Sequence, residues 1–486
     1  MKEQEYDIVA IGGGTSGLVA AAGSAYLGAR SALIERDRLG GDCLWTGCVP
    51  SKALIASAKR AHGISDAGHL GLSAPTAEHD FGAVMKRMRD ARDVVANHDD
   101  PDRFRAMGVA VHHGAARFLG PNVVEVEGVG RIRSKRFVIA TGAEAWVPPI
   151  QGLAEAGYLT NANVFDTDTR PDRLIVLGGG PIGLELAQVY SRLGTSVTVL
   201  EMLPQLLPKE DADVGELLRT KLEAEGIKIL TGRRVIQIDE KDGAKRALTD
   251  DNEWHEGDEI LVATGRRANT HELGLEEVGA TIDRGVKVDD HLRTTAPNIW
   301  AAGDVTGGLQ FTHVAEYMAK TVIQNALLPV KKKADYSNVP WVTYTDPEVA
   351  HIGMSEEAAS ERGGKTYRYD FADLDRAIAD GDTTGFVKIS ADKKGRVMGA
   401  TIVGGGAGEL IFPLVFAQTH RIPLPKISNT IFPYPTRMEG VKRAADAYQR
   451  ERLEGAGGKL LKRVVKWMAY KRLASLQAIR RRVVRF

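Results

Sequence analysis

Two glycine-rich segments, each set between a strand and a helix, constrain the fold of this 486-residue chain more than any other feature. The first is Gly12-Gly-Gly14-Thr-Ser-Gly17, which follows an apolar run and precedes an Ala- and Leu-rich helix at residues 18–27 and a strand at 31–35. The first glycine permits a tight turn, the second lets a pyrophosphate approach the backbone, and the third lets helix and strand pack closely. The phosphates then lie at the helix N-terminus, and Glu35 at the strand end can accept hydrogen bonds from a ribose diol. The segment therefore predicts a dinucleotide site.

The same pattern occurs a second time. A strand at residues 173–177 leads into Gly178-Gly-Gly180-Pro-Ile-Gly183, a helix at 184–193 and a strand at 196–201 that ends in Glu201. Glu201 has the same offset from Gly178 as Glu35 has from Gly12. Two complete dinucleotide sites in one chain predict an α/β fold with two Rossmann-type domains.

The chain has only two cysteines, Cys43 and Cys48, in the segment Gly40-Gly-Asp-Cys-Leu-Trp-Thr-Gly-Cys-Val-Pro-Ser-Lys52. A small secreted scaffold held by disulfides would carry many more. One isolated pair indicates a dithiol that cycles with its disulfide, although free cysteines also occur as small hydrophobic residues of a core. Two dinucleotides beside a dithiol suggest an electron relay from nicotinamide through flavin to sulfur.

The length and the charge of the chain limit the number of domains and the kinds of partner that we expect. At this length we expect about three domains rather than one core. The net charge of +1 gives no global field that would attract nucleic acid, so we expect none as a partner. The polar start of the chain and the lack of an apolar run long enough to span a bilayer make cytoplasmic residence the expectation.

These motifs resemble those of the class I flavoprotein (pyridine nucleotide) disulfide reductase family. The resemblance extends to Ala140-Thr-Gly142 and Ala263-Thr-Gly-Arg266, where such chains cross between cofactor domains, and to residues 295–304 and 339–348. It implies an FAD-binding domain from residues 1–150 and 281–340, an NAD(P)H-binding domain at 151–280, an α+β dimerisation domain at 341–450, and a basic tail at 451–486. Two strand-like runs joined by a turn at 392–395 independently predict an antiparallel layer in the third of these.

The resemblance also implies the roles at the reacting centre. Cys48 is the sulfur that faces the flavin and forms a charge-transfer pair as a thiolate, and Cys43 is the outer thiol that attacks the substrate. Lys52 and Glu185 match an ion pair beside the flavin N5, although two such residues also form ordinary pairs on helix surfaces. One FAD per subunit and NADH or NADPH are the expected cofactors.

NADH is favoured because a carboxylate at position 201 accepts from a free 2′-hydroxyl and repels a 2′-phosphate. The residues expected to bind the cofactors are Gly12, Gly14, Thr15, Ser16, Gly17, Glu35, Gly41, Asp42, Lys52, Ala115, Thr141, Gly142, Gly178, Gly180, Ile182, Gly183, Glu201, Val235, Gly265, Asp304, Gln310, Phe311 and Thr312.

One departure from the family pattern bears on the substrate. The family places a His-x-x-x-x-Glu pair near the C-terminus, which reaches into the partner subunit's site and protonates the leaving thiol. In this chain Tyr434 stands where the histidine would be, and Glu439 keeps its place. A tyrosine, with a pKa of about 10, is a poor proton shuttle at neutral pH. This argues against glutathione disulfide and lipoamide, and it implies a homodimer completed by the partner's Tyr434 and Glu439.

The stretch around Tyr434 is similar to mercuric reductase, which predicts reduction of Hg(II), a soft ion that suits two thiolates. Yet we find neither the N-terminal metal-binding domain nor the C-terminal cysteine pair of those enzymes in this sequence. The alternative is a reductase of hypothiocyanous acid or another small sulfur oxidant. Less favoured are a lipoamide dehydrogenase-like activity and a flavin electron-transfer or membrane partner protein with idle thiols.

The tail after Glu454 carries no acidic residue and has apolar residues on one helical face, with Leu461, Val465 and Met468 among them. This pattern is compatible with a helix that lies on an anionic membrane surface, and also with a solvated or partner-docked helix, which the sequence slightly favours. His112, His113 and His313 show no metal-ligand spacing, so no bound metal is expected.

Overall fold

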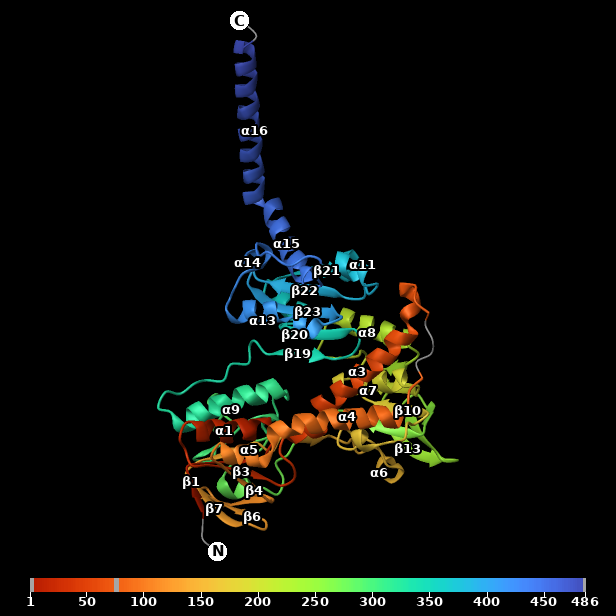
Figure 1. Cartoon of the computed structure of the whole chain (residues 1–486), viewed down its shortest axis with the longest axis vertical. Coiled ribbons are helices and arrows are strands. Elements are labelled where there is room, and N and C mark those ends of the chain that lie inside the picture. Colours follow the sequence, from red (N-terminus) through yellow and green to blue (C-terminus); the bar gives the residue numbers. More distant parts are fainter. Residues whose placement is uncertain (1–3, 74–77, 484–486) are drawn as a thin grey trace. The chain divides into compact units, whose positions relative to one another are not determined.

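The computed structural model describes residues 4–73 and 78–483, with side chains in those ranges except at 456 and 472–483. The chain forms two compact units (Figure 1). Unit 1 comprises Met1–Tyr336 with Thr343–Thr345, and unit 2 comprises Ser337–Val342 with Asp346–Phe486.

A five-stranded parallel sheet in the order β18-β8-β2-β3-β4 forms the centre of the first glycine-rich motif. Every residue of β2 is buried, as a strand covered on both faces requires. Helix α1 packs on β2, β3 and helix α9. The bounds of these elements are β2 Ile8–Ile11, α1 Thr15–Tyr26, β3 Ser31–Glu35, β4 Val109–His113, β8 Phe137–Ile139, β18 Ile299–Ala301 and α9 Thr312–Leu327.

A four-stranded parallel sheet in the order β12-β11-β10-β16 repeats the arrangement around the second motif. Helix α7 packs on β10 and β11 and also against α3, the helix that begins at Cys48. The bounds are β10 Arg173–Leu177, α7 Pro181–Arg192, β11 Ser196–Glu201, β12 Lys228–Thr231, β16 Glu259–Val262 and α3 Cys48–Ser65. The two sheets confirm the predicted pair of Rossmann-type folds.

Both motif helices begin three residues earlier than expected. The apolar pattern predicted starts at residues 18 and 184, whereas α1 begins at Thr15 and α7 at Pro181. Pro181 suits the first helical position because its missing N–H would lack a helical partner there anyway. Hydrophobic periodicity detects the buried apolar face of a helix. The first three residues of each of these helices contribute no large buried apolar side chain, so the pattern misses them.

Unit 2 contains the antiparallel strands β20, β23, β22 and β21, with β19 at the edge. The predicted hairpin is confirmed as β22 and β23, which pair from Phe386↔Val403 onward. Helix α15 packs on β21 and β22, and α13 packs on β23. The bounds are β19 Pro340–Thr343, β20 Glu348–Gly353, β21 Lys365–Asp370, β22 Phe386–Ala391, β23 Val397–Gly404, α13 Phe412–Thr419, α14 Leu424–Ser428 and α15 Glu439–Glu454. This is the expected α+β fold.

The other elements connect these layers. A two-stranded antiparallel sheet, β9 with β17, joins the segments after Thr141-Gly142 and Gly265. Further bounds are β1 Gln4–Tyr6, α2 Gly41–Trp45, α4 Phe81–Ala96, α5 Pro101–Ala106, β5 Ala116–Gly120, β6 Val123–Val126, β7 Gly130–Ser134, β9 Ala143–Ala145, α6 Leu153–Ala156, α8 Ala212–Ala224, β13 Val235–Lys241, β14 Ala244–Thr249, β15 Trp254–Gly257, β17 Arg266–Ala268, α10 Glu356–Glu361, α11 Asp375–Ala379 and α12 Ala407–Leu410.

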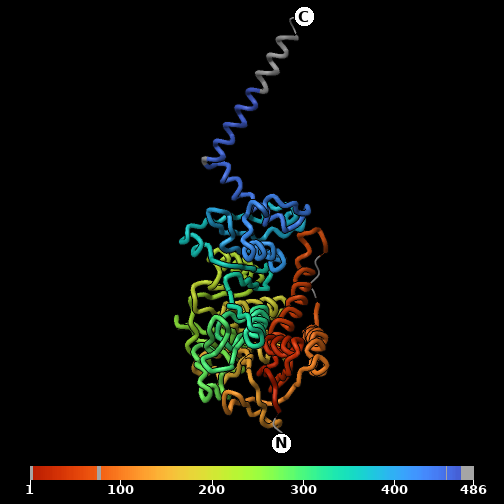
Figure 2. Tube along the Cα trace, turned by 90° about the vertical axis from the view of Figure 1, so that its left-hand side faces the viewer, coloured from red at the N-terminus to blue at the C-terminus, as the bar shows by residue number. Residues whose placement is uncertain are grey.

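A long helix, α16 (Ala456–Val483), follows α15 in unit 2, and its coloured part extends away from the sheet of that unit in both views (Figures 1 and 2). Within the described ranges, no helix combines the length and the apolar character needed to cross a membrane. The finer boundaries at residues 150, 280 and 340 stay predictions.

Candidate active site

The two cysteines lie in two consecutive helices. Cys43 is in the short helix α2, and Cys48 is the first residue of the 18-residue helix α3. A thiolate at a helix N-terminus is favoured by the macrodipole and by unpaired N–H groups. The Sγ atom of Cys48 also lies 3.7 Å from the hydroxyl of Thr312, the first residue of α9. Two helix N-termini that are far apart in the sequence, those of α3 and α9, therefore meet at Cys48.

The two thiols differ sharply in acidity. A hydrogen bond from the Cys43 thiol, the charge of Lys52 and the hydroxyl of Thr312 together outweigh burial and lower the pKa of Cys48 to about 6. The same hydrogen bond, burial and the charge of Cys48 raise the pKa of Cys43. The proton of the pair therefore resides on Cys43 at neutral pH, and Cys48 is the thiolate.

This pKa predicts how the reduced enzyme reacts with an alkylating agent. Because only a thiolate attacks iodoacetamide, modification of Cys48 should accelerate as the pH rises through about 6 and then level off. An ordinary cysteine would show its rise near pH 9.0. In Thr312→Val the midpoint should move to higher pH, while Thr312→Ser should keep the parent profile. Inactivation rates measured across this pH range test the expectation, and a single rise close to the ordinary value would contradict it.

Lys52 and Glu185 form the ion pair that the sequence predicted. The Nζ atom of Lys52 lies 2.8 Å from Oε2 of Glu185, which is buried on α7. The other oxygen, Oε1, accepts a hydrogen bond of 2.8 Å from the backbone N–H of Tyr344. Lys52 also lies over the ring of Tyr344, 4.4 Å from its centroid. Lys52 is one turn beyond Cys48 on α3, so its charge is held beside the thiolate.

The first glycine-rich loop has the backbone geometry that a dinucleotide requires. Gly12 has φ +106°, and a Cβ there would lie 2.3 Å from the carbonyl oxygen of Ala140. A Cβ on Gly17 would lie 1.8 Å from the carbonyl oxygen of Gly12, so helix and strand meet too closely for any side chain. At Gly14 the nearest atom to a Cβ would be the Cα of Gly41, 3.8 Å away, which leaves the backbone open to a phosphate. These residues fit the predicted flavin dinucleotide.

A half-buried charge network completes this end of the site. Arg266 lies 2.8 Å from a carboxylate oxygen of Asp42 and 3.6 Å from one of Asp304. Burial raises the pKa of Asp304, although Arg266 opposes it. Within the part of the chain that the structure describes, the buried Nε of Arg266 has no hydrogen-bond partner, so it can donate to an acceptor on a ligand. Asn161 fixes Asp42 from the other side, at 2.9 Å.

The remaining residues predicted for the first dinucleotide surround this region. Ser16 donates to the carbonyl oxygen of Ala315 at 2.9 Å and so ties α1 to α9. The carboxylate of Glu35 accepts a hydrogen bond from the backbone N–H of Gly13. The backbone carbonyl of Glu35 accepts one from the N–H of Gly114, which places Ala115 next to Glu35.

The other predicted residues lie where α1 and α9 begin and where the chain crosses between domains. The Thr141 hydroxyl donates to the backbone carbonyl of Asn269, and the N–H of Asn269 donates to the carbonyl of Gly142. Thr15 opens α1, Gln310 and Phe311 directly precede α9, and the Phe311 ring stacks on His313.

The second glycine-rich loop has equivalent geometry. Gly178 has φ +113°, a Cβ on Gly183 would lie 2.1 Å from the carbonyl oxygen of Gly178, and Gly180 has open space where a side chain would stand. Glu201 is buried at the end of β11 and accepts from the backbone N–H groups of Gly179 and Leu203, at 2.6 and 2.7 Å. Ile182 is exposed on the first turn of α7, Gly265 follows β16, and Val235 opens β13.

Tyr434 and Glu439 belong to unit 2. The exposed hydroxyl of Tyr434 donates to Asp375 at 3.1 Å, and this bond raises the pKa of Tyr434. Glu439 is buried at the start of α15, 3.8 Å from Arg443. Their assignment to the partner subunit's site stays a prediction.

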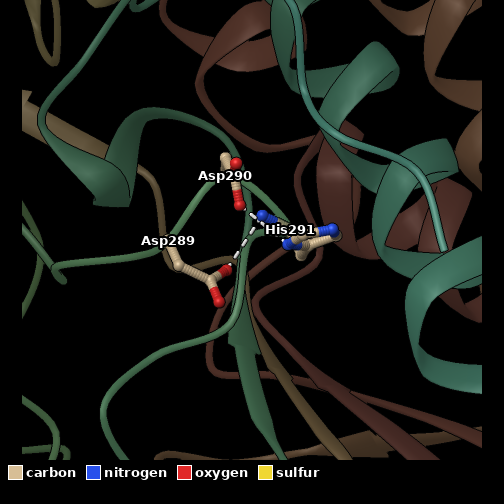
Figure 3. A group of neighbouring side chains, drawn as sticks. All are labelled: Asp289, Asp290 and His291. Carbon is tan, nitrogen blue, oxygen red and sulfur yellow. Dashed lines mark hydrogen bonds and ion pairs between the residues drawn. The ribbon is translucent and has the colours of Figure 1, made fainter.

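One group of possible metal ligands occurs among the described residues, and it lies apart from this chemistry. Asp289, Asp290 and His291 point toward one another on a single turn (Figure 3). Asp289 accepts from the backbone N–H groups of His291 and Arg293, and Asp290 pairs with Lys333 at 2.5 Å. These bonds account for the cluster as a turn with an ion pair.

Comparison with known proteins identifies the class of protein that this fold and site define. Residues 6–319 match the family model described as pyridine nucleotide-disulphide oxidoreductase, and residues 339–445 match the dimerisation domain of that family. The chain therefore belongs to the pyridine nucleotide-disulphide oxidoreductases: it is a flavoprotein disulfide oxidoreductase that uses FAD and NAD(P)H and carries the family's dimerisation domain.

Its relatives cover several members of the family. A mercuric reductase of Lysinibacillus sphaericus is 34% identical over 93% of this chain and 84% of its own length. The mitochondrial dihydrolipoyl dehydrogenase of Dictyostelium discoideum is 35% identical over 92% of this chain and 95% of its own. Among solved structures, the Cu(II) complex of the HOCl-induced flavoprotein disulfide reductase RclA of Escherichia coli matches with a TM-score of 0.83 and 29% identity, over 92% of this chain and all of that one.

The structure adds three residues that sequence reasoning did not assign to the site. Arg266 and Tyr344 lie inside segments that the resemblance singled out, but their contacts with Asp42 and with Lys52 depend on the folded arrangement. Asn161 lies in no motif, and no sequence feature indicated it. Thr312 was predicted as a cofactor contact, and its contact with the Cys48 sulfur was not foreseen.

Proposed function

We propose that this enzyme passes electrons from NADH through FAD to Cys43 and Cys48, and from these sulfurs to a soft electrophile, with Hg(II) as the acceptor. The observation that carries the proposal is Tyr434. The hydroxyl that replaces the family's histidine is hydrogen-bonded to Asp375 and has a raised pKa, so it holds its proton at neutral pH. A reductase of thiol disulfides needs an acid–base group there, whereas reduction of a metal ion does not.

The dithiol supplies the ligands for such an ion. FAD, when bound, accepts a hydride from the nicotinamide and passes two electrons onward. Hg(II) binds the Cys48 thiolate and the Cys43 sulfur, which releases its proton. Overall, NADH and Hg(II) give NAD⁺, Hg(0) and one proton. No thiol has to leave, so no proton is required at Tyr434.

A second candidate acceptor is hypothiocyanous acid or a related small sulfur oxidant. The observation that favours it is that the chain holds no cysteine besides Cys43 and Cys48, so it has no further thiols to deliver mercury inward. The Cys48 thiolate would take up the Cys43 proton, so that Cys43 attacks the electrophilic sulfur as a thiolate and the displaced hydroxide leaves as water with that proton. Cys48, again a thiolate, would then displace thiocyanate and close the disulfide. Overall, NADH and HOSCN give NAD⁺, SCN⁻ and water. Thiocyanate is a weak base and leaves unprotonated.

Two further points belong to the proposal. Glu201, held by two backbone N–H groups, presents a carboxylate where NADPH would bring its 2′-phosphate, which supports NADH as the donor. The dimerisation domain supports a homodimer in which Tyr434 and Glu439 of the partner subunit complete the site around Cys43.

A substrate panel tests the proposal. With NADH as donor, kcat/KM for Hg(II) or hypothiocyanous acid should exceed that for glutathione disulfide or lipoamide by at least about a hundredfold, because the disulfides lack their acid–base group. Tyr434→His should raise turnover of a disulfide, whereas Tyr434→Phe should not. High turnover of either disulfide by the unaltered enzyme would exclude the proposal, and preference among the two electrophiles decides between the two candidates.

A further inference from the structure

The C-terminal helix α16 is not accounted for by the reductase. The family models end at residue 445, and α16 begins at Ala456. Every residue from Lys459 to Lys471 is exposed. A helix whose side chains are exposed all round gains little stability from tertiary contacts. The apolar residues of this stretch therefore have no role in the core of unit 2.

One face of this helix is apolar and faces solvent. Its six large apolar side chains recur at intervals of three and four residues, which places them together along one side. They are 41–63% exposed: Leu460, Leu461, Val464, Val465, Trp467 and Met468. We call this set the apolar face of α16. An exposed apolar stretch of this kind marks an interaction surface.

The opposite face is basic. Lys459, Lys462, Arg463 and Lys466 follow the same three- and four-residue intervals on the other side of the helix. Over residues 455–486 the chain has ten Lys and Arg residues and no acidic residue. Because the whole chain carries +1, residues 1–454 carry −9, and the positive charge is concentrated in the tail.

From this arrangement we infer that α16 binds the surface of an anionic phospholipid bilayer, lying in its plane with the apolar face inserted and the basic face toward the headgroups. Charge complementarity and the apolar face are the two features that such binding requires. Trp467 and Tyr470 are aromatic residues of the kind enriched at the level of the headgroups.

Other kinds of binding partner match the two faces of α16 less well. Nucleic acid would use the cations but gains nothing from six apolar side chains on one face. A second copy of α16 would match the apolar face, but each tail (residues 455–486) brings ten cations without one acid, so the two tails repel. An anionic bilayer satisfies both faces at once.

Co-sedimentation of the full-length holoenzyme with phosphatidylcholine vesicles, with and without phosphatidylglycerol, tests the inference. Binding to the anionic vesicles should be stronger by about tenfold or more and should weaken as salt is raised. Lys462→Gln with Lys466→Gln should weaken it by about tenfold, and Leu461→Gln with Val465→Gln should also weaken it. Lys393→Gln with Lys394→Gln removes the same charge from an exposed turn of unit 2 and should leave binding unchanged.

The outcomes separate this surface from the reductase site. NADH oxidation should be the same in all these variants, which shows that they fold and makes the result independent of the electron acceptor. Equal binding to neutral and anionic vesicles would overturn the inference, as would tail variants that bind vesicles like the parent. The inference would also be wrong if the tail variants changed only the mass of the oligomer in solution. In that case α16 would form a contact between two copies of the chain.

Discussion

Replacing Cys43 by serine will lower turnover of the electron acceptor by about a thousandfold or more, and replacing Cys48 will do the same. Serine keeps the size of the side chain, but its hydroxyl neither ionises at neutral pH nor forms a disulfide. The two sulfurs act as one unit, since Cys43 holds the proton whose hydrogen bond stabilises the Cys48 thiolate. Loss of either should therefore cost about as much as loss of both.

The control is an electron acceptor that does not need the sulfurs. Ferricyanide takes electrons from reduced flavin directly, so its NADH-dependent reduction should persist in both serine variants and show that the cofactors still bind. Steady-state kinetics with Hg(II), hypothiocyanous acid and ferricyanide measure both effects. A Cys43→Ser enzyme that still reduced the first two at the parent rate would place the dithiol outside the reaction.

Replacing Lys52 by methionine will lower the free energy of unfolding of the holoenzyme by about 2–4 kcal/mol. This range lies toward the lower end of the losses found when one partner of a buried ion pair is removed. The loss arises because the buried Glu185 carboxylate loses its cation while, among the described residues, the hydrogen bond from the N–H of Tyr344 is left to it. The Lys52 side chain is 34% exposed, so solvent screens part of its interaction with Glu185. We therefore expect a smaller loss of stability than for a fully buried ion pair. The urea midpoint at a fixed FAD concentration measures the change.

A double-mutant cycle shows whether the loss comes from this pair. Lys52→Met with Glu185→Gln should be more stable than Lys52→Met alone, because no buried charge is then left unpaired. The matched control is Lys86, which pairs with Asp90 on α4 with both side chains exposed, and Lys86→Met should cost about 0.5 kcal/mol or less. Equal losses at the two lysines would show that burial of Glu185 does not matter.

Much of the fold follows from local patterns in the sequence. Strands β3 and β11 match their predicted bounds because both are mostly buried parallel strands whose apolar residues lead up to a recognisable acid. The glycine positions were predictable for a similar reason: each glycine is required by a local backbone contact, such as that between Gly17 and Gly12. The starts of α1 and α7 were misplaced because their first turns carry no buried apolar residue.

The site was predictable in part. The pair of Lys52 with Glu185 came from family resemblance, since the two residues are 133 positions apart and no local pattern joins them. Contacts of Thr312 with Cys48 and of Arg266 with Asp42 follow from how α9 and the β16–β17 segment pack, which a single sequence does not reveal. The difference in pKa between the cysteines likewise depends on these neighbours.

Anaerobic titration of the oxidised holoenzyme with NADH tests the central claim most directly, namely that electrons leave the flavin through one sulfur couple. A flavin and a disulfide each store two electrons, so complete reduction of the parent enzyme should consume about two equivalents of NADH per FAD. The Cys43→Ser variant, with the flavin alone, should consume about one. An unaltered enzyme that is fully reduced by one equivalent, as its variant is, would contradict the account.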